Sequence, residues 1–167
     1  MQIASFIGIV VVTVLVMEAV AWLLHRYVMH GFMWSIHKTH HEPRKGAFEL
    51  NDAFGVAFAL PSALLINLGT RGNELAMAVG IGISVYGVIY FFFHDMLVHR
   101  RVDLGLRPRS GYLARIVQAH RLHHAVQGKD GCVAFGFIFA PSPKRLKKML
   151  AETGGQDMRQ PTPRPSA

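Results

Sequence analysis

Apolar residues in this chain are collected into three long runs separated by short polar segments. The first run, residues 3–24, and the third, residues 75–93, are each long enough to cross the roughly 30 Å hydrocarbon core of a bilayer as a helix. The middle run, residues 53–69, is shorter and contains Pro61, so it either spans as a short helix or enters and leaves on one side. Because helices satisfy their own backbone in lipid, the pattern predicts an all-α integral membrane protein with about three spanning helices.

Shorter segments complete the predicted architecture. The sequence "TRGNE", residues 70–74, is typical of a tight hairpin between the second and third runs. Residues 111–124 place apolar and histidine side chains at helical spacing, which predicts an amphipathic helix with Ser110 as its N-cap. Residues 132–140 are apolar but too few to span, so we expect them to pack on the domain or to dip into the membrane interface.

The composition agrees with a single membrane domain. Of the 167 residues, 51% are hydrophobic and 17% are charged, against roughly 25% charged in an ordinary soluble domain. We expect one domain over residues 1–153 and a disordered tail over residues 154–167. The single cysteine, Cys132, excludes an internal disulfide framework, a CxxC zinc site and a cysteine-ligated iron–sulfur cluster. Its apolar neighbours favour a packing role over a nucleophilic one.

Basic residues are distributed unevenly between the segments that connect the runs. Of the 18 Lys and Arg residues, only Arg71 lies in the hairpin, and none precedes the first run. The positive-inside rule therefore predicts an outside N-terminus, with residues 25–52 and 94–167 facing the cytoplasm. The net charge of +8 is then explained by topology, lipid headgroups and a protein partner, and we expect no nucleic-acid partner.

The ten histidines fall into two blocks that share one pattern, H-x4-H followed by H-x2-H-H. Their members are His25, His30, His37, His40 and His41 in the first block, and His94, His99, His120, His123 and His124 in the second. H-x2-H-H crowds three imidazoles on one helical face, and a cation bound by neutral imidazoles resolves their mutual repulsion. Imidazole suits iron, zinc, copper and nickel.

The H-x4-H pairs have a different geometry. Two residues at this spacing lie about 140° apart on an ideal α-helix, so a straight helix cannot direct both at one ion. We therefore expect the second histidine to lie past the helix end, as Gly31 directly after His30 indicates.

The number of histidines favours two metal ions. About five nitrogen ligands each would still leave an open position on either ion, and a metal pair can divide a demanding reaction between two centres. Both blocks follow spans that run from outside to inside, so they can meet at the cytoplasmic face. A divalent-metal transporter places its ligands near the bilayer midplane, and a haem-binding electron carrier leaves most of the histidines unexplained.

Four segments carry a resemblance to a known family. The segments "HRYVMHG", "HKTHHEPRKGAFELND", "FFFHDMLVHRR" and "VQAHRLHHAVQGKDGCVAFGFIFAP" resemble, in order and spacing, bacterial β-carotene hydroxylases of the membrane fatty acid hydroxylase and desaturase superfamily. The resemblance covers residues 18–150. It implies an enzyme of the bacterial cytoplasmic (inner) membrane with a non-haem diiron centre, which uses molecular oxygen to hydroxylate C3 of the β-ionone rings of carotenoids. A fatty acyl hydroxylase or desaturase of the same superfamily is the alternative.

What the resemblance implies for the site is that all ten histidines are metal ligands or their immediate neighbours. Two iron ions are the expected cofactors, and zinc can occupy the same nitrogen ligands. No catalytic residue is predicted beyond the metal centre. The chain has no Rossmann glycine fingerprint, no cysteine cluster and no length for a flavin domain. We therefore expect an external electron donor, a ferredoxin with its reductase, on a basic surface that includes Arg100, Arg101, Arg107, Arg109, Lys144, Arg145, Lys147 and Lys148.

Polar residues near the histidines are candidates for hydrogen bonds to the ligands, because ligating histidines usually donate their other N–H. Glu18 lies seven residues before His25 on the same helix face, and buried membrane acids are functional candidates, although helix pairing explains it equally. The others, for each of which ordinary capping is as good an explanation, are Glu42, Glu49, Asn51, Asp52 and Asp95.

Two tyrosines lead along the third span toward the second block. Tyr86 and Tyr90 lie eight and four residues before His94, on one helical stripe. This stripe is a candidate lining for a slot that holds a long polyene. Aromatic anchoring at the membrane interface explains Tyr90 nearly as well.

Overall fold

The computed structural model describes residues 1–44 and 46–153, and within them the chain is helical without β-strands. The predicted disordered tail lies outside the described residues. The predicted all-α class is confirmed. The elements, of which the two marked η are π-helical, are α1 (Ile3–Leu23), η1 (Leu24–Phe32), α2 (Trp34–His41), α3 (Asp52–Thr70), α4 (Glu74–Tyr90), η2 (Phe91–Val98), α5 (Gly111–His123) and α6 (Pro143–Glu152).

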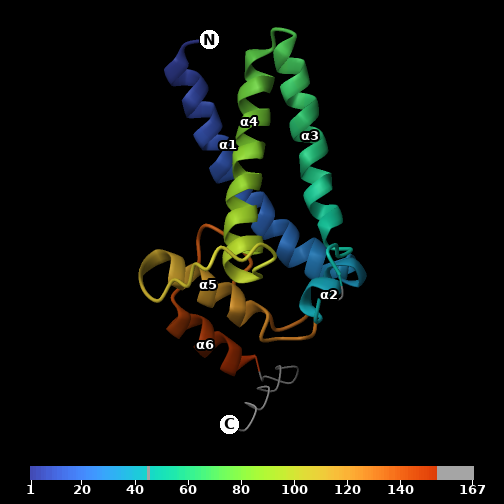
Figure 1. Cartoon of the computed structure of the whole chain (residues 1–167), viewed down its shortest axis with the longest axis vertical. Coiled ribbons are helices and arrows are strands. Elements are labelled where there is room, and N and C mark those ends of the chain that lie inside the picture. The colour runs from blue at the N-terminus through green and yellow to red at the C-terminus, as the bar shows by residue number, and fades with distance from the viewer. Residues whose placement is uncertain (45, 154–167) are drawn as a thin grey trace.

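Three helices are long and apolar enough to cross a membrane: Ile3–Phe32, Asp52–Thr70 and Glu74–Val98. They run alongside one another, with the N-terminus at one end and α2, α5 and α6 gathered at the other (Figure 1). The middle helix continues through Pro61 without a break, so the alternative of a segment that turns back is wrong. Their outward sides expose large apolar side chains suited to lipid, among them Ile7, Val12, Leu60, Leu64 and Val88.

Helix α4 packs closely against both α1 and α3 at glycines. A Cβ atom on Gly82 would lie 2.5 Å from the Cβ of Thr13 in α1, and one on Gly80 would lie 2.9 Å from Ile66 in α3. Small residues of this kind let helix backbones approach within a membrane, where packing replaces the hydrophobic effect. The hydroxyl of Ser62 also donates a hydrogen bond to the Gly80 carbonyl at 2.7 Å. The three long helices therefore form a frame whose lower end fixes the histidines.

Helices α5 and α6 and the segment between them form a small apolar core beneath this frame. As predicted, α5 begins directly after Ser110 and exposes its polar side, although Ser110 makes no side-chain cap hydrogen bond. The apolar segment after α5 packs on the domain, and burial raises the pKa of the Cys132 thiol to about 12, which supports the packing role. The buried core residues are Ala119, Val126, Cys132, Val133, Phe135, Leu146 and Leu150.

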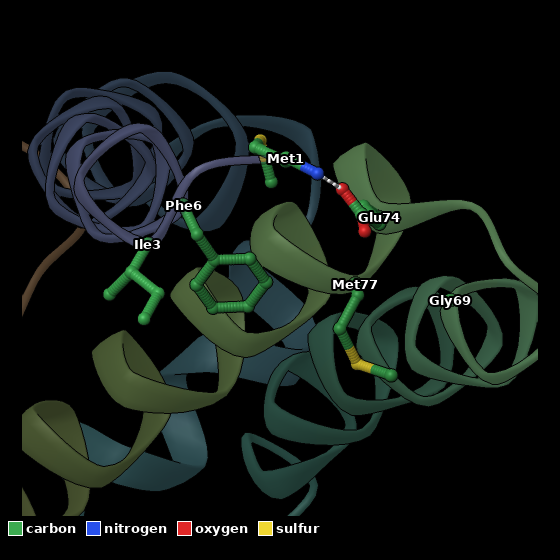
Figure 2. Close-up of a pocket in the computed structure, with 6 residues that line it drawn as sticks. All are labelled: Met1, Ile3, Phe6, Gly69, Glu74 and Met77. Atoms are coloured by element: carbon green, nitrogen blue, oxygen red, sulfur yellow. Dashed lines mark hydrogen bonds and ion pairs between the residues drawn. The ribbon is translucent and has the colours of Figure 1, made fainter.

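A cavity of about 300 Å³ opens at the opposite end of the molecule, where α1 begins near the α3–α4 turn (Figure 2). The amino group of Met1 pairs there with the carboxylate of Glu74. This end is far along the helices from the histidine-bearing elements (Figure 1). The cavity therefore does not belong to the histidine site. Its lining residues are Met1, Ile3, Phe6, Gly69, Glu74 and Met77.

Candidate metal centre

The H-x4-H pairs lie on π-helical segments at the ends of two spans. His25 and His30 belong to η1. His94 belongs to η2, and the N–H of His99, directly after η2, donates to the carbonyl of His94 at 2.9 Å, five residues back. The i→i+5 pattern of a π-helix turns residues at this spacing toward one side, with ring centroids 5.2 Å apart for His25 and His30 and 4.5 Å for His94 and His99. The prediction that the second histidine of each pair lies past the helix end is confirmed for His99, which directly follows η2, and is wrong for His30. Gly31, which does leave helical geometry, lies one residue later, still inside η1.

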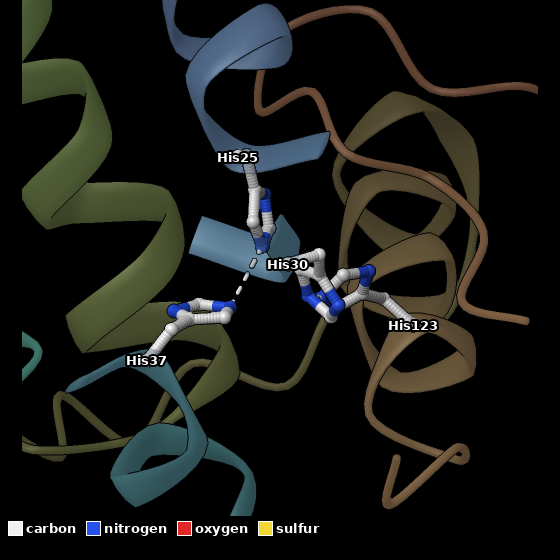
Figure 3. Close-up of side chains that lie close together, drawn as sticks. All are labelled: His25, His30, His37 and His123. Atoms are coloured by element: carbon white, nitrogen blue, oxygen red, sulfur yellow. Dashed lines mark hydrogen bonds between the residues drawn. The ribbon is translucent and has the colours of Figure 1, made fainter. Parts of the chain in front are cut away.

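The histidines converge in two groups of four. In each group the nearest ligand atoms lie within 4.8 Å of one another, as four ring nitrogens around one ion require. Figure 3 shows the first group, in which rings from η1, α2 and α5 turn toward a common point. The groups are His25, His30, His37 and His123, and His40, His94, His99 and His120.

The two remaining histidines, His41 and His124, lie between the groups, with ring centroids 4.4 Å apart, and form a third group with His123. The ring of His41 is 5.1 Å from that of His30 and 5.0 Å from that of His123. The ring of His124 is 4.7 Å from those of His40 and His99. On these distances His41 adjoins the rings of the first group and His124 those of the second, which gives five imidazoles to each candidate centre. We call His25, His30, His37, His41 and His123 the first set, and His40, His94, His99, His120 and His124 the second set.

Each set takes four histidines from one sequence block and one from the other. The exchanged residues are the middle histidines of the two H-x2-H-H motifs, His40 and His123. The Nε2 of His40 lies 2.8 Å from that of His94, and the Nε2 of His123 lies 3.2 Å from that of His30. Both blocks meet at one end of the molecule, as the sequence predicted, and they interlock there.

Hydrogen bonds on the outer nitrogens hold the rings of the first set in orientation. The Nδ1 atoms of His25, His30 and His123 face backbone carbonyls, those of Phe135, Lys129 and Val133, each at 2.9 Å. Such bonds fix the tautomer and leave Nε2 as the free ligand atom. In the same way the Nδ1 of His37 faces the side-chain oxygen of Asn51 at 2.7 Å. These acceptors are all neutral.

In the second set, carboxylates replace the carbonyls. The Nδ1 of His40 faces Oε2 of Glu49 at 3.0 Å, and the Nδ1 of His94 faces Oδ1 of Asp95 at 3.0 Å. Asp95 is therefore placed against a histidine, like Asn51 in the first set. Glu42 is exposed at the end of α2, and the contact expected of it is made by Glu49 instead.

Asp52 does not contact a histidine directly. Its Oδ2 accepts from the backbone N–H of Glu49 at 2.9 Å, and its Oδ1 accepts from Arg101 at 2.7 Å. Arg101 also lies 3.5 Å from Oε2 of Glu49 and 3.6 Å from Oδ1 of Asp95. Arg101, which was predicted to lie on an exposed docking surface, instead lies among three carboxylates. The one feature of the sequence that pointed to a place near the histidines was the position of Arg101, two residues after His99.

Burial keeps the imidazoles that lie outside the spans neutral. It lowers the pKa of His37 to about 3, and burial together with the neighbouring His94 lowers that of His99 to about 2. A neutral imidazole is the form that binds metal. Four other histidines also have a pKa well below the ordinary value. Burial is the larger cause, and repulsion from neighbouring histidines is the smaller one. These residues are His40, His120, His123 and His124.

Glu18 is buried in α1 and connects three parts of the chain. Its Oε1 accepts hydrogen bonds from the backbone N–H groups of Phe137, Ile138 and Phe139 at 2.9, 2.9 and 3.0 Å. Its Oε2 accepts from the hydroxyl of Tyr86 in α4 at 2.7 Å. Glu18 therefore anchors the apolar segment after α5, and it also links α1 to α4.

The segment that Glu18 anchors covers both sets of histidines. The ring of Phe137 lies parallel to that of His25 with centroids 5.8 Å apart, and 5.6 Å from that of His94. Gly136 leaves room for this turn, because a Cβ there would lie 2.6 Å from Oε1 of Glu18. Phe137 lies in an apolar stretch, and no feature of the sequence distinguishes it from its neighbours.

The two tyrosines of the predicted stripe have different surroundings. Tyr86 is buried against α1 through its bond to Glu18. The ring of Tyr90 stacks on that of His94, with centroids 4.5 Å apart, and meets Phe137 edge-on at 4.8 Å. Tyr90 and Phe137 are therefore the aromatic residues that adjoin the second set on the side of the spans, and a lining role for Tyr86 stays a prediction.

The donor set fits a pair of transition metals. Nitrogen ligands converge in two adjacent groups, their outer nitrogens are fixed, and the rings of His120 and His123, one from each set, are 5.5 Å apart. Imidazole sites of this kind suit iron and zinc. The arrangement can hold two ions side by side beneath the membrane-spanning helices.

The chain is similar to known hydroxylases. The family model described as fatty acid hydroxylase matches residues 10–142. The chain is 52% identical to a β-carotene hydroxylase of Pantoea ananas over 88% of this chain and 84% of that protein. It is 49% identical to a β-carotene hydroxylase of Paracoccus sp. (strain PC1), over 87% and 91% of the two chains.

More distant relatives come from plants, and no solved structure matches the chain. The chain is 37% identical to the chloroplastic β-carotene 3-hydroxylase 2 of Arabidopsis thaliana, over 84% of this chain and 45% of that protein. The family match covers most of this chain, including both sets of histidines. This protein therefore belongs to the fatty acid hydroxylase family.

Proposed function

We propose that this protein is a membrane-bound β-carotene 3-hydroxylase with a diiron centre held by the two sets of histidines. The observation that carries the proposal is the convergence of eight histidines into two adjacent groups of four ring nitrogens, with His41 and His124 in a third group that shares His123. The identity of about 50% to bacterial proteins named β-carotene hydroxylase supports the choice of substrate.

The proposed reaction inserts one oxygen atom into the C–H bond at C3 of a β-ionone ring. Dioxygen, two external electrons and two protons enter, and the hydroxylated carotenoid and one water leave. Two bound iron ions supply the oxygen-activating chemistry, because imidazole-ligated iron with open positions suits that reaction. Zinc can occupy the same ligands without supplying this redox chemistry.

The protein's own residues orient the ligands and shape the place where the ring reacts. Carbonyls, Asn51, Glu49 and Asp95 fix the outer nitrogens of seven histidines, His41 through the carbonyl of Val126 among them. Phe137 and Tyr90 adjoin the rings from the side of the spans. A lipid-dissolved carotenoid reaches the site from that side, and these two side chains exclude water from the reacting C–H bond.

The test is an assay of the purified protein on defined substrates. β-Carotene is expected to be converted to its 3-hydroxy and 3,3′-dihydroxy products, the latter being zeaxanthin, in the presence of oxygen and reductant. Conversion of fatty acyl lipids with no conversion of β-carotene would instead support the alternative hydroxylase or desaturase function. A transporter is disfavoured because the histidines lie on the last turns of two spans and on α2 and α5, which gather at one end of the spans (Figure 1), away from a midplane site.

We expect the histidine end to face the cytoplasm, with the protein in the bacterial inner membrane. A reporter inserted at Gly72, in the turn between α3 and α4, is expected to be accessible from outside the cell. A reporter fused after residue 153, beyond α6, is expected to be accessible from the cytoplasm only. The reverse pattern would contradict the proposed orientation, which follows from the basic residues.

Turnover is expected to require an external electron donor, a ferredoxin with its reductase. The exposed basic side of α6, with its buried residues Leu146 and Leu150 facing α5, offers a docking surface for an acidic partner. Electrostatic steering of this kind weakens as salt is added. The exposed basic residues of α6 are Lys144, Arg145, Lys147 and Lys148.

The donor requirement is measured with purified protein, oxygen and β-carotene. Product is expected with ferredoxin, its reductase and NADPH, and the rate is expected to fall as ionic strength rises. Sustained turnover from NADPH alone would contradict the requirement for a donor. A ferredoxin-dependent rate that ignores ionic strength would contradict only the docking surface, and would leave topology and lipid headgroups as the explanation of the charge.

A further inference from the structure

The two sets of histidines are related by sequence pattern but differ in the groups that orient them. His25 and His94 hold equivalent positions in the two blocks, and so do His123 and His40. In the first set the two equivalent histidines face the backbone carbonyls of Phe135 and Val133. In the second set they face carboxylates. Histidines at equivalent positions therefore face neutral acceptors in the first set and anionic acceptors in the second set.

One guanidinium lies between those two carboxylates. Arg101 faces Oε2 of Glu49 at 3.5 Å and Oδ1 of Asp95 at 3.6 Å, and these are the same oxygen atoms that the histidines face. His40 and His94 in turn meet at 2.8 Å between their Nε2 atoms. The five side chains close a ring in which a metal ligated by the two histidines would lie opposite Arg101.

Further bonds fix Arg101 in this ring. Its NH1 donates to Oδ1 of Asp52 at 2.7 Å, and its backbone N–H donates to the carbonyl of Asp95 at 2.7 Å. Its side chain is only 15% exposed. A planar fork with several donors can face three carboxylates at once, whereas the ammonium of a lysine is a point charge on a flexible stem.

We propose that Arg101 is a positioning residue that sets the metal affinity of the second set and leaves the first set unaffected. The inference rests on the proposed two-metal site. Without the guanidinium, Glu49, Asp52 and Asp95 repel one another in a partly buried place, and the two carboxylates leave the positions that orient His40 and His94. Loss of such outer partners costs about 10- to 100-fold in metal affinity.

The test of this role is metal binding by the full-length protein in detergent. The protein is first stripped of metal and is then titrated with Co²⁺. Wild-type protein is expected to bind two ions per chain. Arg101→Lys, which keeps a positive charge among the carboxylates, is expected to weaken one of the two by about 10- to 100-fold. The control is Arg107→Lys, an exposed arginine of the same loop that pairs with Asp103, and it is expected to bind both ions as wild type does.

Two variant backgrounds, each with one set of histidines broken, show which of the two metal sites is weakened. In His30→Ala, which breaks the first set, Arg101→Lys is expected to weaken the ion that remains. In His99→Ala, which breaks the second set, the same substitution is expected to change nothing. Asn51→Ala is expected to give the opposite pattern, because Asn51 faces His37 of the first set.

Equal weakening of both sites by Arg101→Lys would show a general structural role and overturn the inference, and so would unchanged binding at both. Either result leaves the proposed function intact, provided that the wild type binds two ions. Glu49→Gln removes one orienting carboxylate without exposing an unpaired charge, and should weaken the second set alone even if an Arg101 variant fails to fold. A protein that shows the selective effect but does not hydroxylate β-carotene would contradict the function and support the role of Arg101.

Discussion

Replacing His123 by alanine is expected to lower β-carotene hydroxylation by at least about 100-fold while the protein still inserts and folds. His123 belongs to the first group of four and also to a group with His41 and His124, so its loss leaves a vacant ligand position at the point where the two sets meet. A ligand contributes more than the outer partners whose loss already costs 10- to 100-fold. His40→Ala, the equivalent change in the second set, is expected to behave alike.

Metal content and activity are measured together in this experiment. Active wild-type enzyme is expected to contain two irons per chain, and both variants less. Helical content measured by circular dichroism is expected to be unchanged, since the three long helices are held by packing around α4. The control is Gln118→Ala, an exposed position on the same helix as His123. One iron per chain in fully active enzyme, or activity without iron, would contradict the diiron proposal.

Replacing Glu18 by leucine is expected to reduce turnover by about 100-fold with most of the iron retained. Glu18 bonds to no histidine in the described chain, but it accepts four hydrogen bonds. Leucine leaves these buried donors without an acceptor, at a cost of about 1–3 kcal/mol for each. The turn that carries Phe137 then moves away from the rings, and a displacement of about 1 Å can cost about 100-fold in rate.

Two further variants test whether the hydrogen bonds explain the effect. Glu18→Gln retains an oxygen for the three backbone N–H groups, so it is expected to keep most of the activity. Gly136→Ala is expected to lower turnover as Glu18→Leu does, because the added Cβ would lie 2.6 Å from Oε1 of Glu18. Wild-type turnover in Glu18→Leu would show that the position of Phe137 does not matter for the reaction.

The spans and the meeting of the histidine blocks were predictable because they depend on local properties of the sequence. The length of an apolar run shows whether it can cross the bilayer as a helix. Two histidine blocks that follow spans of the same direction must emerge at the same end of the molecule. The π-helical turns were harder to predict from the sequence. Spacing alone showed that His25 and His30 disagree with a straight α-helix, but it did not show that the backbone changes its hydrogen bonding to reconcile them.

The partners of the histidines depend on how the chain returns in space, and sequence distance does not report this. Glu42 is adjacent to His41, yet α2 ends there and directs it outward. Glu49 is nine residues from His40 and returns to it through the loop before α3. Arg101 looked like one of many basic surface residues, because the three acids around it come from two separate segments. Their convergence is a property of the fold.

The exchange of His40 and His123 makes the two centres a single unit of assembly. As the chain is synthesised, the first block leaves the ribosome with four of its own ligands in place, but its fifth arrives only when α5 has folded. The second block likewise depends on a residue made more than fifty positions earlier. Neither half of the chain can supply a full set of five histidines by itself, so both sets are completed only after the second block has folded against the first.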